Sequence, residues 1–218
     1  MIVVNNGMGE RSLVHSGFSW EKEIIGEIIR SCDEDVYLPS DDTYLMVRYL
    51  INFLRSFKIM NTLEIGSGSG FIACLICRDT EYLVLTDIDP ASAECTYKIS
   101  QTCGCGDRTD TLICRSGGCF RDKSFDLIYS NPPYLPCDDD IRVCGGSDGV
   151  SVALDLLSNI RRILRDRGVA LMLLSSLGDL RKFLAEAHKN GYIVKVVDKL
   201  RKFFEILMVL MIMRRNGY

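Results

Sequence analysis

The chain has 218 residues, a length that suits one sizeable α/β domain with a single core. Its hydrophobic content of 47% and charged content of 25% are ordinary for a globular protein and argue against extensive disorder. The formal net charge of −3 gives no general attraction to phosphate backbones, so nucleic acid is not expected as the substrate.

The ten cysteines raise the question of disulfides or a metal site. Residues 1–9 lack the basic segment and the long apolar run of a secretory signal, so we expect reduced thiols in a cytoplasmic protein, with the nucleus as the alternative location. Cys74 and Cys77 are spaced as CxxC within an apolar stretch, which favours small buried thiols. The strongest metal candidates match no zinc pattern and have no histidine nearby, so no metal site is expected; they are Cys103, Cys105, Cys114 and Cys119.

Residues 1–35 are interpreted as an N-terminal extension with one short helix, and residues 36–218 as the main domain. Ser19 can cap a helix from Trp20 to Arg30, in which isoleucines recur at helical spacing. After an extended segment, Ser40 is the expected N-cap of a helix from Asp41 to about Ser56. Capping and the helix dipole account for the two aspartates of its first turn without any further function.

A glycine-rich loop follows the first buried strand, which we expect over residues 61–65. The glycines at 66, 68 and 70 permit positive φ and close backbone approach, and an apolar run from Phe71 to Cys77 predicts a helix directly after them. The next strand, from Tyr82 to Thr86, ends in Asp87, 17 residues after Gly70. A carboxylate there can accept hydrogen bonds from two ribose hydroxyls, so loop and acid together indicate a cofactor that contains adenosine.

Helices and strands alternate over the rest of the chain. We expect a helix from Pro90 to Ser100 capped by Asp89, and further helices over 150–164 and 180–189. Strands are expected over 111–114, 125–130, 169–175, 192–197 and 204–213. The last two strands are joined by a short connection, which predicts that they are antiparallel. The final apolar run is too short to cross a bilayer as a helix, and no membrane association is expected.

Four residues, Asn131-Pro132-Pro133-Tyr134, follow the strand over 125–130 and therefore lie at its carboxyl end. Open α/β sheets bind ligands at that edge, next to the point where strand order reverses. The two prolines fix two φ angles and remove two N–H donors, so the amide and the carbonyls beside them have a nearly fixed geometry that suits an NH₂ group. A turn that ends the strand is the simpler alternative.

The glycine loop, Asp87 and the Asn-Pro-Pro-Tyr segment together resemble the class I S-adenosylmethionine-dependent methyltransferases. The resemblance covers residues 36–218 and implies a seven-stranded mixed α/β sheet of order 3-2-1-4-5-7-6, with strand 7 antiparallel and helices on both faces. Asn-Pro-Pro-Tyr at this place resembles enzymes that methylate a nitrogen conjugated to a planar group. The stretches Val36 to Thr43 and Gly145 to Gly149 are similar to those of the release-factor glutamine methyltransferases, in the eukaryotic and archaeal branch.

That resemblance implies transfer of a methyl group from S-adenosylmethionine to the glutamine of a Gly-Gly-Gln motif in a translation release factor. The catalytic residues it implies are Asn131, Pro132 and Tyr134. The cofactor-binding residues it implies are Tyr37, Pro39, Thr43, Glu64, Gly66, Gly68, Gly70, Asp87 and Asn131. The substrate-binding residues it implies are Asn131, Pro132, Pro133, Tyr134, Gly145 and Gly146.

The resemblance also implies a small zinc-binding activator subunit as an obligate partner in a heterodimer. We expect it at the edge strand, near Leu112 and Ile113, because an exposed apolar edge favours pairing with another chain. One residue departs from the family: the acid that accepts from the adenine amino group falls near Arg115, which cannot accept. Backbone groups, or Asp110 if the strand is placed differently, are the alternatives.

Three other functions remain open at this stage. An adenine-N6 methyltransferase acting on nucleic acid would use the same Asn-Pro-Pro-Tyr geometry, but it must also extract a base and hold phosphates. A protein-lysine methyltransferase is an alternative that only the site of methylation separates. A scaffold without activity is suggested by Arg115 alone.

Overall fold

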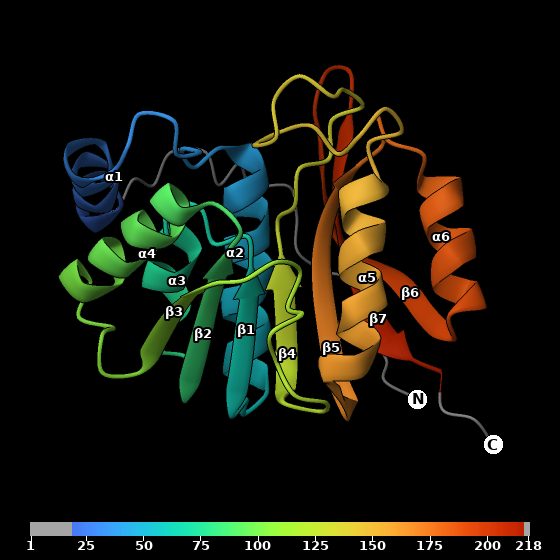
Figure 1. Ribbon diagram of the computed structural model, residues 1–218, viewed down its shortest axis with the longest axis horizontal. Coiled ribbons are helices and arrows are strands. Elements are labelled where there is room, and N and C mark those ends of the chain that lie inside the picture. Colours follow the sequence, from blue (N-terminus) through green and yellow to red (C-terminus); the bar gives the residue numbers. More distant parts are fainter. Residues whose placement is uncertain (1–18, 216–218) are drawn as a thin grey trace.

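The computed structural model describes residues 19–215 as one α/β unit (Figure 1). The helices are α1 (Ser19–Ser31), α2 (Asp41–Ser56), α3 (Phe71–Ile76), α4 (Pro90–Thr102), α5 (Ser151–Ile163) and α6 (Leu180–Lys189). The strands are β1 (Asn61–Ile65), β2 (Tyr82–Asp87), β3 (Thr109–Ile113), β4 (Phe125–Ser130), β5 (Leu164–Ser175), β6 (Tyr192–Arg201) and β7 (Ile206–Arg214).

The seven strands form one sheet of order β3-β2-β1-β4-β5-β7-β6, which confirms the predicted order. Strand β7 runs antiparallel to β5 and β6, as expected, and the other neighbours are parallel. The strand order reverses between β1 and β4, which lie side by side with Glu64 opposite Tyr129. The glycine loop after β1 and the Asn-Pro-Pro-Tyr segment after β4 therefore meet at one edge of the sheet.

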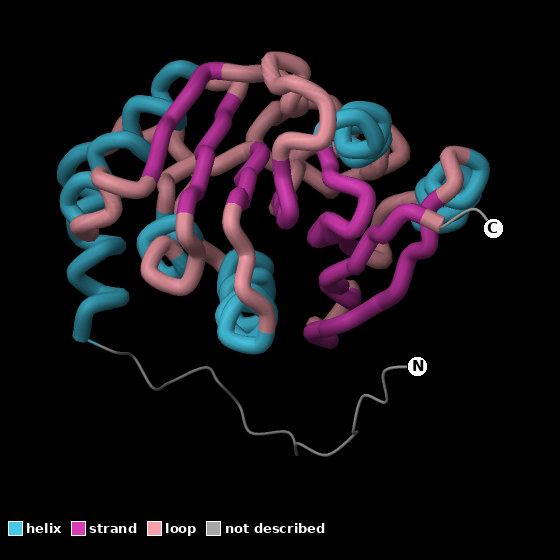
Figure 2. Tube along the Cα trace, turned by 90° about the horizontal axis from the view of Figure 1, so that it is seen from below, coloured by secondary structure: helices cyan, strands magenta, loops and turns pink. Residues whose placement is uncertain are grey.

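Helices cover both faces of the sheet (Figure 2). On one face, α5 and α6 pack on the sheet in a core that includes Leu156, Ile160 and Phe183. On the other face, α2 and α3 pack through residues such as Leu50 and Ile76. Apolar side chains on both sides of a sheet exclude water from its backbone, so the parallel strands are buried as such sheets require. The polar edge where the strands end is left for ligands.

Helix α1 is joined to the same unit. Ile28 is buried in a third cluster with Phe71 and Ile99, and the Cys32–Cys95 disulfide links the end of α1 to α4. The N-terminal helix of the predicted extension therefore shares packing with the glycine-loop helix. The first 18 residues of that extension lie outside the described residues.

Several predicted boundaries differ from those observed. Strand β5 begins at Leu164, five residues before the predicted start, because it continues directly from α5 and pairs with β4 through a register shift. Strand β3 starts at Thr109 and ends at Ile113, before Cys114. Strand β6 extends to Arg201. Phe204, predicted as the first residue of the last strand, lies instead in the β6–β7 turn, and β7 starts at Ile206.

All ten cysteines are paired, so the expectation of reduced thiols is wrong for this structure. The pairs are Cys32–Cys95, Cys74–Cys103, Cys77–Cys105, Cys114–Cys119 and Cys137–Cys144. The two cysteines of the CxxC do not pair with each other but with the two that follow α4. Three bridges join cysteines 63, 29 and 28 residues apart. Such pairs depend on the tertiary fold, and spacing in the sequence does not reveal them. None of the helices described is long and apolar enough to cross a membrane.

Candidate functional site

The glycine loop lies between β1 and α3 with its backbone in the left-handed region. The φ angles of Gly66, Gly68 and Gly70 are +77°, +54° and +73°. A Cβ atom at Gly66 or Gly68 would meet no atom within 4 Å, so this part of the loop faces open space. At Gly70 a Cβ would lie 3.0 Å from the Thr96 Cα atom, which explains the need for glycine where the loop packs on α4. The loop thus leaves its backbone open to a ligand at Gly66 and Gly68.

Asp87, at the end of β2, contacts the same loop. Its carboxylate accepts from the backbone N–H of Gly68 at 2.8 Å and from that of Asp89 at 3.0 Å. Burial raises the pKa of Asp87 above its usual value, and the two backbone N–H groups act in the opposite direction. Each carboxylate oxygen keeps a further lone pair, so the group can still accept from hydroxyls of a ligand. Asp87 therefore lies where the sequence predicts the ribose acceptor.

Glu64 is 1% exposed and lies on β1 directly before the loop. Its carboxyl accepts a hydrogen bond from the Tyr129 hydroxyl at 2.9 Å, and its backbone carbonyl accepts from the Thr86 hydroxyl at 2.9 Å. Burial raises the pKa of Glu64 well above its usual range. These contacts tie β1 to β4 and to β2, so Glu64 has a structural role here in addition to any contact with a cofactor.

The Asn-Pro-Pro-Tyr segment meets the start of α2 at Asp42. The Asp42 side chain is 3% exposed and accepts from the Asn131 Nδ2 and from the Tyr134 hydroxyl, both at 3.1 Å. The Tyr37 hydroxyl lies 3.1 and 3.2 Å from its two oxygens, and the Thr43 N–H donates to it at 2.6 Å. Four residues predicted for the site are thus gathered around a carboxylate that sequence reasoning assigned only to helix capping.

Asp42 fixes the orientation of the Asn131 amide. A carboxylate is only an acceptor, so it binds the Nδ2 end and turns the Oδ1 end away. That Oδ1 atom is buried and has no hydrogen-bond partner among residues 19–215. A buried carbonyl oxygen without a partner is costly, and it is satisfied when a ligand supplies an N–H. The arrangement therefore leaves an acceptor oxygen unused at the carboxyl edge of the sheet.

Two tyrosines enclose Asp42. Burial raises the pKa of Tyr37 and of Tyr134 well above the usual tyrosine value, and the charge of Asp42 adds to the effect in both. Both phenols therefore stay protonated and act as hydrogen-bond donors over the whole physiological range. Pro39, predicted with Tyr37 as part of a cover over the cofactor, is half-buried in the segment that leads to α2.

Residues 135–149 form a structured loop over the Asn-Pro-Pro-Tyr backbone. The Tyr134 N–H donates to the Val143 carbonyl at 3.1 Å, and the Gly145 N–H donates to the Leu135 carbonyl at 2.8 Å. A Cβ at Gly145 would lie 2.8 Å from the Pro133 carbonyl oxygen, and Gly146 has a φ of +87°. Gly145 thus allows the loop to pack closely on the segment, and Gly146 allows it to pack on Ser151 at the start of α5. The sequence did not predict these structural roles.

The residues after β3 differ from the expected adenine-binding pattern. Arg115 pairs with Asp155 on α5, with an Nε to Oδ2 distance of 3.5 Å, and the Ser116 hydroxyl donates to the same carboxylate at 2.6 Å. Asp110 is the second residue of β3 and accepts from the Tyr82 hydroxyl, so it lies away from the carboxyl ends of the strands. Asp110 is therefore not the acid that the family uses to accept from the adenine amino group. The residue next to Arg115 that carries a side-chain oxygen is Ser116.

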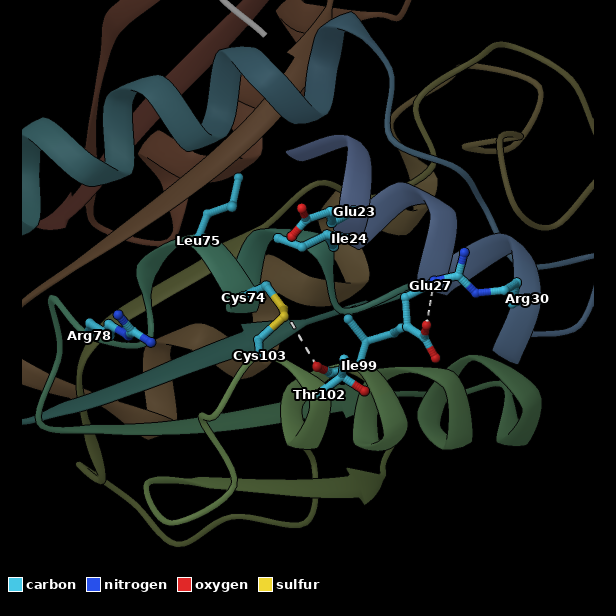
Figure 3. A pocket seen from close by; sticks show the side chains of 10 residues that line it. All are labelled: Glu23, Ile24, Glu27, Arg30, Cys74, Leu75, Arg78, Ile99, Thr102 and Cys103. Atoms are coloured by element: carbon cyan, nitrogen blue, oxygen red, sulfur yellow. Dashed lines mark hydrogen bonds and ion pairs between the residues drawn. A yellow bond between two sulfur atoms is a disulfide. The ribbon is translucent and has the colours of Figure 1, made fainter. Parts of the chain in front are cut away.

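The cavity drawn in Figure 3 lies outside this site. It has a volume of about 710 Å³ between α1, α3 and α4, and its lining includes Glu23, Glu27, Arg78 and the Cys74–Cys103 disulfide. It faces away from the Asn131 and Asp87 side chains, which line no part of it. Among residues 19–215, no group of three or more histidine, cysteine or acidic side chains is placed to hold a metal ion.

Solved structures share this fold. An Mtq2–Trm112 complex from E. cuniculi, described as responsible for methylation of the termination factor eRF1, aligns with a TM-score of 0.66 over 83% of this chain and 99% of its own, at 20% identity. A ribosomal protein L11 methylase from Lactobacillus delbrueckii aligns with a TM-score of 0.64 at 18% identity, over 85% of this chain and 84% of its own. The fold is that of a Rossmann-like methyltransferase. No protein-family model matches the chain.

Curated relatives of this chain carry related names. It is 27% identical over 187 residues to a Methanocaldococcus jannaschii protein named for protein N5-glutamine methyltransferase activity, covering 81% of this chain and 90% of that one. It is 26% identical over 212 residues to the eRF1 methyltransferase catalytic subunit mtq2 of Schizosaccharomyces pombe, covering 83% and 90%. Two bacterial release factor glutamine methyltransferases also match, but the chain spans only 42% and 30% of their lengths.

Proposed function

We propose that this protein transfers a methyl group from S-adenosylmethionine to the side-chain nitrogen of a glutamine in a translation release factor, with residues 36–218 as the methyltransferase domain. The observation that carries the proposal is the Asn131 amide, which Asp42 holds with a buried, unpartnered Oδ1 at the carboxyl edge of the sheet. The names of relatives that align along nine tenths of their length support glutamine as the acceptor.

Asn131 acts on the nucleophile, which is the difficult part of the reaction. An amide nitrogen is weakly nucleophilic because its lone pair is delocalised into the carbonyl. The Asn131 Oδ1 accepts one N–H of the glutamine and the Pro132 carbonyl accepts the other, so positive charge on the attacking nitrogen is stabilised as it develops. The nitrogen would gain the methyl group as the sulfonium S–CH₃ bond breaks, so that S-adenosylhomocysteine leaves and one N–H proton passes to water. Tyr134 packs against the planar amide, and its hydroxyl stays protonated and donates a hydrogen bond to Asp42.

The bound cofactor supplies an electrophilic methyl group on a sulfonium. Gly66 and Gly68 leave room for its methionine end, and Asp87 accepts from its ribose hydroxyls. Tyr37, Pro39 and Thr43 cover the cofactor from the α2 side. Glu64 supports the loop by holding β1, which leads into it, against β4. Holding the reacting atoms in line supplies much of the acceleration, since positioning alone is worth roughly 7–11 kcal/mol.

The experiment that tests the function uses the purified heterodimer, labelled S-adenosylmethionine and a release factor. We expect label in the wild-type release factor and none when the glutamine of Gly-Gly-Gln is replaced. Peptide mass mapping places the added methyl on that glutamine. Label on a lysine, or greater transfer to an oligonucleotide than to the release factor, would replace the glutamine assignment with one of its alternatives.

Cofactor affinity should depend on pH through Asp87. Burial raises the pKa of this carboxyl, so it takes up a proton at a higher pH than an ordinary aspartate does. The ribose hydroxyls need the ionised form, and affinity is therefore expected to weaken as pH falls through the raised pKa and to level off above it. Calorimetric titration of S-adenosylmethionine from acid to neutral pH measures this dependence.

The Asp87→Asn variant is the control for that titration. It should bind the cofactor about ten-fold more weakly at neutral pH, because hydrogen bonds to a charged acceptor are the stronger ones, and its affinity should no longer change with pH in the acid range. A wild-type affinity that is flat with pH would remove Asp87 from the ribose site.

The partner we propose is a small zinc-binding activator subunit that pairs with the free edge of β3. This strand ends the sheet, and Leu112 and Ile113 on it are 42% and 63% exposed. An exposed apolar edge strand offers both backbone hydrogen bonds and side-chain contacts to a second chain. The complex formed by the structural neighbour Mtq2 with Trm112 supports a partner of this kind.

The Ile113→Asp variant tests this edge. We expect it to lose co-purification with the activator and to aggregate less readily when expressed alone, because a charge opposes pairing at an apolar edge. Val196→Asp on β6 is the matched control, since β6 is the opposite edge of the sheet and Val196 is 55% exposed. Loss of the activator in the Val196 variant, with retention in the Ile113 variant, would move the interface to β6.

A further inference from the structure

Two phenylalanines project from the tip of the β6–β7 hairpin. Phe203 and Phe204 are 92% and 84% exposed, and their rings stand edge to face with centroids 4.6 Å apart. The hairpin reaches the carboxyl edge of the sheet, because Leu207 pairs with Ser175 at the end of β5. Large apolar side chains fixed on a surface beside a site mark a place where another molecule binds.

The hairpin tip is held in place rather than hanging free. The Lys202 N–H donates to the Glu205 carbonyl at 2.8 Å, and the Glu205 carboxylate accepts from the Ser175 hydroxyl at 2.7 Å. Lys202 also pairs with Asp41 at 2.7 Å. Asp41 precedes Asp42, the carboxylate that orients Asn131, so a short series of contacts connects the phenylalanines to the amide.

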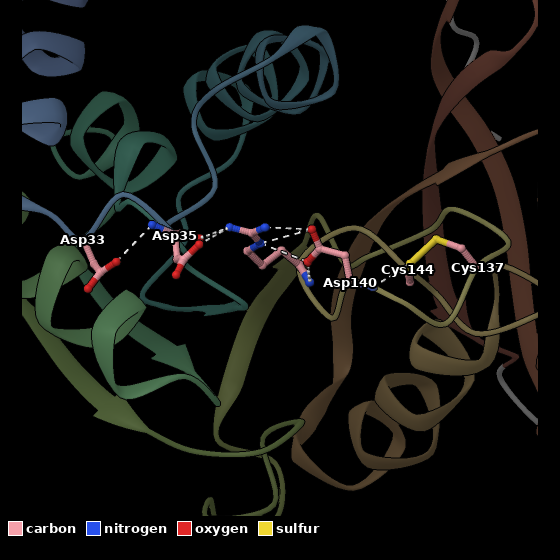
Figure 4. A network of polar contacts seen from close by, with 6 residues as sticks. Asp33, Asp35, Cys137, Asp140 and Cys144 are labelled. Atoms are coloured by element: carbon pink, nitrogen blue, oxygen red, sulfur yellow. Dashed lines mark hydrogen bonds and ion pairs between the residues drawn. A yellow bond between two sulfur atoms is a disulfide. The ribbon is translucent and has the colours of Figure 1, made fainter.

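An acidic stretch lies on the loop that follows the Asn-Pro-Pro-Tyr segment. Asp138 and Asp139 are exposed on the loop that starts at Tyr134, which itself contacts Asp42. The Cys137–Cys144 disulfide closes this loop, and Arg142 joins it to the segment between α1 and α2 through Asp35 at 2.9 Å (Figure 4). Asp140 is neutralised by Arg142.

Within residues 19–215, neither Asp138 nor Asp139 has a hydrogen bond or an ion pair, in contrast to Asp140. Two unneutralised carboxylates on a braced loop attract a positively charged partner. The apolar side chains at the hairpin tip and the negative charges on the loop together favour a partner with apolar and positively charged side chains.

We propose that the Phe203–Phe204 tip and the Asp138–Asp139 pair form a docking surface for the substrate protein, which presents basic and apolar side chains around its acceptor glutamine. This proposal rests on the proposed function, because the surface would bind the segment of the substrate protein that carries the acceptor glutamine. The two phenylalanines supply contact area, and the two aspartates attract and orient the approaching segment.

Two double variants test the surface: Phe203→Ser with Phe204→Ser, and Asp138→Asn with Asp139→Asn. Each is made in the heterodimer, and binding of the intact release factor is measured by biolayer interferometry alongside methylation kinetics. We expect the dissociation constant and KM to rise roughly five-fold or more in each, with kcat and S-adenosylmethionine affinity unchanged. Added salt should weaken binding of the wild type more than that of the aspartate variant.

Leu184→Ser on α6 and Asp107→Asn before β3 are the matched controls, since Leu184 is 45% exposed and the Asp107 side chain 76%. Unchanged release-factor binding in both double variants would overturn the proposal. So would loss of the activator subunit with unaltered release-factor binding, which would assign the surface to that partner. Failure of the proposed function gives a different result: the wild-type enzyme then forms no methylated release factor, whether or not it binds the release factor.

Discussion

Replacing Asn131 with alanine is expected to lower the rate of methyl transfer by about 10²–10³ while leaving S-adenosylmethionine binding nearly intact. The alanine removes Oδ1, the buried acceptor without a partner, and with it the group that binds the glutamine N–H. Loss of one such oriented polar contact to developing charge costs about 10²–10³ in rate. Single-turnover transfer and calorimetric cofactor binding, measured on the same preparation, separate the two effects.

The control is Asn52→Ala on the exposed side of α2, where the Asn52 amide contacts only the Arg48 carbonyl one turn earlier. It should behave as wild type in both measurements. Equal losses of cofactor affinity and transfer in Asn131→Ala would mean that Asn131 serves the cofactor site or the fold, and the assignment to the glutamine amide would be withdrawn.

Replacing Asp42 with asparagine should lower kcat about 10²-fold without preventing the fold, because it leaves the Asn131 amide able to adopt either orientation. The carboxylate accepts from Asn131, Tyr134, Tyr37 and Thr43, and an asparagine offers one acceptor oxygen in its place. A small misplacement of a reacting group is known to cost a rate factor of this order. The measurement is kcat with saturating release factor and cofactor.

Asp41→Asn is the matched control because Asp41 occupies the same first turn of α2 and its charge contributes to the same helix dipole. It loses the contact with Lys202 but none with Asn131. If both variants lowered kcat equally, the effect would be attributed to the helix terminus and not to the orientation of the amide. Thermal unfolding of each variant shows whether the fold is retained.

Most of the fold could be predicted from the sequence because its strong signals are local. The glycine loop follows the buried strand β1, Asp87 ends β2, and Asn131 follows β4. Once these features indicate a methyltransferase, the strand order brings β1 and β4 together, and the structure confirms that order. Helix α2 also matches its predicted bounds, since Ser40 and the two aspartates after it are strong starting signals.

The role of Asp42 could not be predicted because two of its partners, Asn131 and Tyr134, lie 89 and 92 residues along the chain. An aspartate in the first turn of a helix is fully explained by the helix dipole, so the sequence gives no reason to look further. Burial was the missing information: Asp41 faces solvent and Lys202, while Asp42 is 3% exposed. No pattern of two adjacent acids distinguishes which of them turns inward.

The hairpin tip shows a different limit. Phe203 and Phe204 continue an apolar pattern toward β7, and apolar aromatics normally indicate a strand, so the prediction placed Phe204 in the strand. Strand β6 is longer than predicted and turns only after Arg201, which leaves the two rings in the turn. The prediction of reduced thiols is wrong for a related reason, since the partners in three bridges are brought together only by the packing of α4 and the residues after it on α1 and on the α3 region.

The contact between Asp42 and Asn131 has a consequence for how the chain can be divided. A fragment that starts at β1 would keep the glycine loop, Asp87, the whole sheet and the Asn-Pro-Pro-Tyr segment, which are the features by which such enzymes are found. It would lack the only carboxylate among the described residues that accepts from the Asn131 Nδ2. The Asn131 amide of such a fragment would be free to rotate. The fragment would contain every residue of the motif, but its Asn131 would no longer hold the oxygen and the nitrogen of its amide in fixed places, so it could not distinguish one end of a bound amide from the other.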